Sequence, residues 1–221
     1  MTAGTTAGTS LRGRRRAQVV EELRRAALVL FARRGYDAVT PEEIAEAAGV
    51  SRSTYFRHTP SKESLLVDAL LEGIAGMVGV LESRPTGEPA TDALRHAMAD
   101  CVSQFARADV ETWRTAIRTA PHLIERVALV SADDRRRLVD LTAGRMGVDP
   151  ATDTRPALLV CVTLAVGEQV FRQWVLDPTP APEGLPAQVE HALELVLTGA
   201  WDHPLTVGRR REGGDVADRG S

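Results

Sequence analysis

The chain has 221 residues, 43% of them hydrophobic and 26% charged, with a net charge of −3, which suits a globular fold of one or two domains. No run of about 18 uninterrupted apolar residues occurs, so no membrane span is predicted. The polar, arginine-rich start lacks the apolar segment of a secretory signal, and we therefore expect a cytoplasmic protein.

Charge is distributed unevenly along the chain. Residues 1–62 carry eleven basic and six acidic side chains, a local balance of +5, so the remainder carries −8. A basic N-terminal part joined to an acidic body suggests a module that binds a polyanion. Charge alone leaves a second interpretation open, in which these side chains only solvate helix surfaces. The first 16 residues contain four arginines and are predicted to form a flexible basic arm.

Helical periodicity dominates the sequence and strand alternation is nearly absent, which predicts an all-α fold. From Ala17 to Arg34 apolar residues recur every three or four positions, and Gly35 follows as a typical helix end. This pattern predicts a long first helix.

Two short helices follow, with Gly49 between them. Thr40 is a suitable N-cap for the first, and Ser51 caps the second, which runs to about His58 before Pro60 ends it. A helix of about eight residues is marginal alone, so we expect both to pack against the first helix. A tight turn at Gly49 predicts a helix-turn-helix, which projects its second helix into the DNA major groove. An ordinary helical hairpin with a polar outer face is the alternative.

Helical patterns continue through the rest of the chain. They predict helices at residues 61–82, 89–106, 110–119, 122–146, 154–176 and 186–200. The last two are apolar on more than one side, as expected if they meet the same pair from a second subunit in a four-helix bundle. The Gly-rich, charged end is expected to be disordered.

Ordered motifs follow one another between residues 17 and 66. They are Leu23, Ala26-Ala27, Leu30-Phe31, Gly35, Val39-Thr40, Ile44-Ala45, Ala48-Gly49-Val50, Tyr55-Phe56, His58, Ser61-Lys62-Glu63 and Leu65. Together they resemble the DNA-binding domain of TetR/AcrR-type transcriptional regulators. The resemblance implies an all-α homodimer in which three N-terminal helices bind DNA. A larger helical domain would dimerise and hold a small-molecule inducer.

The resemblance also implies DNA contacts. Thr40 and Lys62 would hold phosphates, and His58 would lie near the DNA backbone. The family often has a phosphate-contacting tyrosine where this chain has Phe56, so we expect Phe56 to pack, while Tyr55 is either a DNA contact or a core residue. The predicted DNA-contacting residues are Thr40, Ser51, Arg52, Ser53, Thr54, Tyr55, His58 and Lys62.

The C-terminal body is similar to a subgroup of regulators of the mycofactocin type, thought to bind acyl-CoA-like ligands. The similarity rests on the segments "WRTAIRTAPHLIERV", "RRRLVDLTAGRMGVDP" and "ALLVCVTLAVGEQVFRQWV". The predicted pocket residues, which helical spacing also allows as core, are Phe105, Trp113, Ile117, Arg118, His122, Phe171 and Trp174. A second group is either a cationic rim for an acidic ligand or a solvated basic face: Arg114, Arg118, His122 and Arg126.

These expectations define a domain organisation. The arm covers residues 1–16, the helix-turn-helix domain 17–62, the ligand-binding and dimerisation domain 63–204, and a disordered tail 205–221. The predicted protein is a homodimeric regulator, controlled by a small organic effector such as an acyl-CoA-like compound or another apolar acid. It would repress transcription from a palindromic double-stranded DNA operator.

Two other functional classes are alternatives to a regulator. A helical enzyme is disfavoured because the sequence has no Gly-rich phosphate loop, no nucleophile-elbow serine and no zinc-spaced Cys/His cluster. The pair His191 and Glu194 is typical of a helix surface, so no catalytic residue, metal or cofactor is predicted. Cys101 and Cys161 fall in apolar patterns and are expected to be buried thiols. An architectural DNA-binding protein without an inducer is the other alternative.

Overall fold

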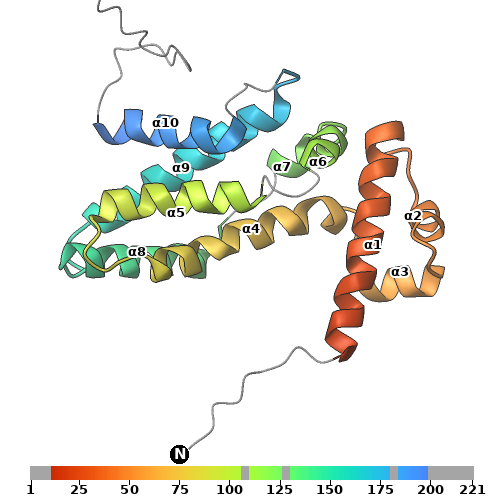
Figure 1. Cartoon of the computed structure of the whole chain (residues 1–221), viewed down its shortest axis with the longest axis horizontal. Coiled ribbons are helices and arrows are strands. Elements are labelled where there is room, and N and C mark those ends of the chain that lie inside the picture. The colour runs from red at the N-terminus through yellow and green to blue at the C-terminus, as the bar shows by residue number, and fades with distance from the viewer. Residues whose placement is uncertain (1–10, 106–109, 126–129, 180–183, 199–221) are drawn as a thin grey trace, which may run out of the picture.

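The computed structural model describes residues 11–105, 110–125, 130–179 and 184–198, and each regular element in these ranges is a helix, which confirms the all-α prediction. Helices α1 to α3 form a unit at one end of the molecule, and α4 leads from it into a body that contains α5, α8, α9 and α10 (Figure 1). Helices α6 and α7 lie between this body and α1 (Figure 1). The bounds are α1 Leu11–Arg34, α2 Pro41–Ala47, α3 Arg52–His58, α4 Ser64–Ser83, α5 Ala90–Phe105, α6 Val110–Ile117, α7 His122–Glu125, α8 Ala132–Met146, α9 Arg155–Leu176 and α10 Gly184–Thr198.

The first helix begins at Leu11, which is earlier than predicted from the sequence. Residues 11–16 therefore continue α1, and of the expected flexible arm only residues 1–10 remain, which lie outside the described residues, as does the predicted tail. Arginine is a good helix former, and Gly13, the one weak helix former in this stretch, costs only about 1 kcal/mol. The prediction used the periodicity of apolar residues alone, which this arginine-rich stretch lacks, and so placed the helix start too late. Gly35, with φ of 84°, ends the helix in the left-handed region.

Caps define the two short helices as predicted. Thr40 precedes α2, and its side chain and that of Glu43 bond reciprocally to each other's backbone N–H groups in a capping box. Gly49, with φ of 67°, turns the chain, and the Ser51 side chain caps α3. The helix-turn-helix predicted around Gly49 is therefore present.

A common core holds α2 and α3 on α1. Leu23 and Phe31 of α1, Ile44 of α2 and Tyr55 of α3 are each at most 1% exposed. Burying a large apolar side chain contributes about 1.5–3 kcal/mol, which helices of seven residues need because they are marginal alone.

The predicted helix at residues 122–146 is interrupted. The structure has α7 at His122–Glu125 and α8 at Ala132–Met146, and residues 126–129 lie outside the described part. Ser131 caps α8 by accepting a hydrogen bond from the Asp134 N–H at 3.0 Å. A cap side chain followed by acidic residues is a helix start signal, which the apolar periodicity had obscured.

Helix α9 packs through one side in the body. It is the only helix among the described residues whose length and composition would allow it to cross a membrane. Val160, Leu164, Phe171 and Trp174 are each at most 5% exposed, as in the core helix of a globular protein, whereas Leu158 is 61% exposed. One face of α9 thus remains uncovered in the single chain.

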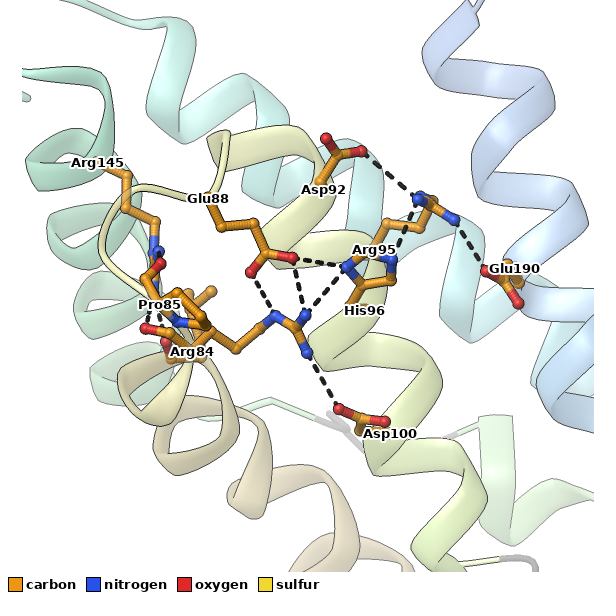
Figure 2. Close-up of polar contacts among 10 residues, drawn as sticks. Arg84, Pro85, Glu88, Asp92, Arg95, His96, Asp100, Arg145 and Glu190 are labelled. Carbon is orange, nitrogen blue, oxygen red and sulfur yellow. Dashed lines mark hydrogen bonds and ion pairs between the residues drawn. The ribbon is translucent and has the colours of Figure 1, made fainter.

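Charged side chains fix the turn between α4 and α5 (Figure 2). Arg84 holds the Glu88 carboxylate with two hydrogen bonds of 2.6 and 2.7 Å, and His96 Nδ1 donates to the same carboxylate at 2.7 Å. Arg84 and His96 lower the pKa of Glu88 to about 2. Arg95 donates to His96 Nε2 at 3.2 Å and to Glu190 of α10 at 2.8 Å, so the network ties α5 to α10.

The C-terminus of α4 is capped from α8. Arg145 donates to the carbonyl oxygens of Leu81, Arg84 and Pro85 at 2.8, 3.0 and 2.6 Å. A guanidinium on otherwise unpaired carbonyl groups stabilises a helix end. Helices α4 and α8 are thereby fixed side by side.

Candidate functional site

Helix α3 presents an exposed polar and aromatic face. Four residues are exposed on it: Arg52, Ser53, Phe56 and Arg57. The Arg52 guanidinium lies 2.9 Å from the Glu42 carboxylate and 5.5 Å from the centroid of the Phe56 ring. A surface ion pair contributes about 0–1 kcal/mol, so a base edge can displace Glu42 at small cost. The geometry leaves Arg52 and Ser53 accessible, and their DNA contacts stay a prediction.

Ser51 and Thr54 take part in the cap of α3. The Ser51 hydroxyl accepts a hydrogen bond from the Thr54 backbone N–H at 3.2 Å. The same oxygen lies 3.0 Å from Ser53 Oγ and 2.9 Å from Thr54 Oγ1. Losing such a cap costs about 0.5–2 kcal/mol. Ser51 therefore sets the start of α3, and a DNA contact through Ser51 or Thr54 would share its hydroxyl with this network.

The two aromatic residues of α3 differ in burial, and Phe56 is not buried as the sequence predicted. Tyr55 is 1% exposed, and burial raises the pKa of its hydroxyl. A hydroxyl in the core cannot reach a phosphate, so of the two roles predicted for Tyr55 the structure shows the core residue and not the DNA contact. Phe56 is 54% exposed and is not a packing residue. Since Phe56 follows Arg52 by four positions, helical spacing places both on one face, a signal that the sequence analysis missed.

Thr40 and His58 lie at the edges of this surface. The Thr40 hydroxyl donates to Glu43 at 2.9 Å, and the hydrogen bonds from Thr40 and Arg34 lower the pKa of Glu43 to about 2. The exposed Thr40 hydroxyl is thus already committed to the capping box. His58 is half-buried, with its Nδ1 buried and without a hydrogen-bond partner in the described part of the chain. Phosphate contacts by Thr40 and His58 stay predictions.

Lys62 has a structural role that its sequence position did not reveal. Its ammonium donates to the carbonyl oxygens of Tyr36 at 2.8 Å and of Val39 at 3.0 Å. The nitrogen also lies 4.0 Å from the centroid of the Tyr36 ring. Two of three N–H donors are therefore used within the chain. Lys62 thus links the α1–α2 loop to the start of α4, and its predicted phosphate contact, which would use the third donor, stays a prediction.

The start of α1 adds positive charge. Arg14, Arg15 and Arg16 are exposed, and the described residues offer them no ion-pair partner. Because they are helical, they form a fixed basic flank instead of the flexible arm expected from the sequence. Exposed cations without partners suit the nonspecific part of DNA binding.

A cavity of about 230 Å³ lies in the body. Its wall is mostly apolar and includes two methionines, which adapt to different shapes. Of the predicted pocket residues, the structure places only Phe105 and Phe171 in this wall. The lining residues are Leu70, Met77, Met98, Cys101, Val102, Phe105, Val130, Arg135, Leu164, Gly167, Glu168, Phe171 and Leu185.

Two charged side chains line the cavity. Glu168 pairs with Arg172 at 2.6 Å. Arg135 is exposed and has no ion-pair partner among the described residues. The charge of Glu168 is thus neutralised, and Arg135 gives the cavity an available positive charge.

Three of the predicted pocket residues lie in the core beside the cavity. Trp113 and Ile117 of α6 and Trp174 of α9 are each at most 5% exposed. The Trp113 ring lies edge-on to Phe105 at 5.0 Å between centroids, so it supports the cavity wall from behind. Its Nε1–H donates to the Leu66 carbonyl of α4 at 2.8 Å. Trp113 thus connects the cavity wall with both α6 and α4.

The predicted cationic rim is absent from the described residues. Arg114 is 3% exposed and donates to the carbonyl oxygens of Trp174 and Asp177 at 2.7 and 2.6 Å, so it caps the C-terminus of α9. Arg118 and His122 are exposed and do not line the cavity, and the predicted fourth member lies outside the described residues. Arg114 is therefore a structural cap. Arg118 and His122 lie exposed, as in the alternative of a solvated basic face, and not in the wall of this cavity.

The side chains that could bind a metal or react as thiols are scattered in the described part of the chain, and one of the two cysteines lines the cavity. The described residues contain no group of three or more His, Cys, Asp or Glu that could hold a metal ion. Cys101 is buried as expected, and burial raises the pKa of its thiol to about 11. Cys161 is exposed on α9, contrary to expectation, because it lies on the uncovered face of that helix.

Known protein families match both parts of the chain. The family described as "Bacterial regulatory proteins, tetR family" matches residues 23–69, which include the helix-turn-helix. The family described as "MftR C-terminal domain" matches residues 88–200, more than half of the chain.

Individual proteins agree with these matches. The HTH-type transcriptional regulator TcmR of Streptomyces glaucescens is 33% identical over 214 residues, which cover 92% of this chain and 95% of the relative. The HTH-type transcriptional activator FasR of Mycolicibacterium smegmatis is 26% identical over 207 residues, or 90% and 92% of the two chains. The crystal structure of NalD, the secondary repressor of the MexAB-OprM multidrug efflux pump in Pseudomonas aeruginosa, shares the fold, with a TM-score of 0.55, 19% identity and coverage of 84% and 97%. These relatives are transcriptional regulators and not enzymes, and this chain belongs to the TetR family of bacterial regulatory proteins, with a C-terminal domain of the MftR type.

Proposed function

We propose that the protein is a ligand-responsive repressor that binds a palindromic operator as a homodimer and is released by a small organic effector. The observation that carries this proposal is the connection between cavity and DNA-binding helices. Trp113 supports the cavity wall, is hydrogen-bonded to α4, and belongs to α6, which packs on α1. Such a regulator would act in the cytoplasm, where its operator is.

The recognition surface supports sequence-specific binding. Arg52 and Ser53 are donors near the start of α3, where helix-turn-helix proteins contact base edges. Phe56 adds an apolar surface next to Arg52 that suits a thymine methyl group. The exposed Arg14, Arg15 and Arg16 would contribute phosphate contacts, which position the protein without reading sequence.

The uncovered face of α9 supports a homodimer. Leu158, Cys161 and Ala165 are exposed at positions i, i+3 and i+7, which lie on one side of a helix. A second copy that packs its α9 and α10 against this face would bury it in a four-helix bundle. The dimer must then hold its two α3 helices about 34 Å apart, one turn of duplex DNA, to reach both half-sites.

The cavity supports an effector with an apolar body and an anionic end. Most lining side chains are apolar, so they favour a hydrocarbon or aromatic group. Arg135 is the lining cation without an ion-pair partner in the described structure, and an apolar acid or an acyl thioester with an acidic group would pair with it. An apolar-tailed acid or thioester is therefore our first candidate.

Effector binding would act on DNA affinity through α4 and α6. A ligand against Phe105 displaces its neighbour Trp113, and Leu70 of α4 lines the same cavity. The ligand releases DNA only to the extent that it binds the DNA-incompetent arrangement more tightly. Coupling of about 1–3 kcal/mol, or about 5- to 150-fold in operator affinity, is typical of such systems.

Genome-wide recovery of DNA bound to the purified full chain tests this function. We expect a few sites with two inverted half-sites, and increased transcription beside them when the gene is deleted. Uniform, salt-sensitive binding to all sequences would instead support the architectural alternative. Decreased transcription on deletion would contradict repression and indicate an activator that uses the same DNA-binding surface.

A further inference from the structure

Tyr36 lies at a junction of three parts of the molecule. It is in the loop between α1 and α2 and is 7% exposed. Its backbone N–H donates to Thr119 Oγ1, just after α6, at 2.9 Å, and its carbonyl accepts from Lys62, just before α4, at 2.8 Å. One peptide segment of the DNA-binding unit is therefore held by residues that flank α6 and α4.

The Tyr36 ring strengthens the same junction. The Lys62 ammonium lies 4.0 Å from its centroid, and the Phe31 ring of α1 lies 5.2 Å away. The His122 ring of α7 approaches edge-on at 6.4 Å. The backbone and the ring of Tyr36 thus both contact Lys62, and both contact the segment after α6, through Thr119 and His122. These contacts fix the loop in one orientation.

Thr119 follows α6 directly, so its position depends on that of the helix. Its hydroxyl donates to the Ala116 carbonyl at 2.7 Å and therefore presents an oxygen lone pair to the Tyr36 N–H. Trp113 of α6, the helix that ends two residues before Thr119, contacts the cavity wall and the Leu66 carbonyl. A short helix moves as a unit, so displacement of Trp113 changes the distance between Thr119 and Tyr36.

We propose that Tyr36, Thr119 and Lys62 form a latch that transmits the state of the cavity to the DNA-binding helices. The proposal rests on the proposed function and adds the contact through which that function operates. With the latch closed, the α1–α2 loop is fixed to both α4 and α6. When a ligand shifts α6, the hydrogen bond from Tyr36 to Thr119 opens, and the DNA-binding unit can change its angle to the body. Thr119 and Lys62 are positioning residues, because they act through Tyr36.

A filled cavity can replace the unidentified effector in a test. A Cβ atom at Gly167 would lie 2.8 Å from Cε of Met98, a flexible side chain that borders the cavity. Gly167→Leu should therefore push Met98 into the cavity and mimic a bound ligand. Leu164→Phe fills the same space from α9 and serves if Gly167→Leu does not fold. Either protein should bind the recovered operator at least about fivefold more weakly than the parent chain.

Thr119→Val removes the acceptor while keeping the shape of the side chain. Thr115→Val is its matched control, because Thr115 is also exposed and lies on α6, and among the described residues its hydroxyl bonds only to the Glu111 carbonyl. In the Thr119→Val background, we expect Gly167→Leu to reduce operator affinity by less than twofold. In the Thr115→Val background, we expect Gly167→Leu to reduce operator affinity as much as it does in the parent chain. Amide exchange at Tyr36 should also be faster in Gly167→Leu than in the parent.

The outcomes separate the latch from the proposed function. An equal loss of operator affinity in the Thr119→Val and Thr115→Val backgrounds would overturn the latch while leaving cavity control of DNA binding in place. Folded Gly167→Leu and Leu164→Phe proteins that bind operator like the parent would overturn cavity control, and the latch with it. Unchanged protection of the Tyr36 amide in Gly167→Leu would also count against the latch.

Discussion

Replacement of Arg52 by alanine should reduce operator affinity far more than affinity for random DNA. In the free protein the substitution removes one exposed ion pair, between Arg52 and Glu42, whose side chains are 71% and 46% exposed. Such a pair is worth about 0–1 kcal/mol, so the fold should persist. On the operator the loss of a base contact should cost about 1–3 kcal/mol, or about 5- to 150-fold in affinity.

Fluorescence anisotropy with operator and scrambled duplexes, each at several salt concentrations, measures both effects. Arg136→Ala is a matched control, because Arg136 is also 71% exposed, pairs with Asp133 at 3.0 Å, and belongs to the body. We expect Arg136→Ala to leave both affinities within about twofold of the parent. Equal losses on operator and scrambled DNA for Arg52→Ala would show that Arg52 contacts phosphate and does not read sequence, and would refute the assignment.

Two further predictions concern acid stability and the effector. Because the pKa of Glu88 falls from 4.5 to about 2 on folding, its stabilising contribution is present above pH 4.5 and is lost as the pH falls toward 2. Glu88→Gln should therefore lower the urea midpoint at pH 7 and flatten its decrease at acidic pH, and parallel curves for both proteins would contradict this. Octanoate and 1-octanol share an eight-carbon chain and differ in charge, so Arg135→Gln should weaken octanoate binding about fivefold in calorimetry, a loss of about 1 kcal/mol, and leave 1-octanol unchanged. Arg136→Gln is the control, and equal weakening of both probes would refute a charge contact.

Local signals in the sequence predicted the DNA-binding unit well. Thr40 and Ser51 are cap residues whose partners lie three positions away, and Gly49 marks the turn through its own backbone preference. Such short-range interactions can be read from the order of residues. The face of α3 was also readable, since the four-residue spacing between Arg52 and Phe56 places Phe56 on the exposed side.

Interactions between distant segments were not readable in the same way. Lys62 bonds to Tyr36, 26 residues earlier, and Arg114 bonds to the Trp174 carbonyl, 60 residues later. Nothing in the sequence near either cation distinguishes a buried cap from a phosphate contact or a ligand rim. The cavity shows the same limit, because bulky residues at helical spacing fit a core as well as a pocket. Only packing shows that Phe171 lines the cavity while Trp174 supports the ring behind it.

The proposed regulation depends on a coupling between occupancy of the cavity and binding of the operator. Its most direct measurement is the operator affinity of the full chain, with and without a compound whose calorimetric binding is abolished by Gly167→Leu. We predict that the compound weakens operator binding about 5- to 150-fold, and that operator DNA weakens binding of the compound by the same factor, as linkage requires. Equal operator affinity with and without a compound bound in the cavity would show that the cavity does not control DNA binding.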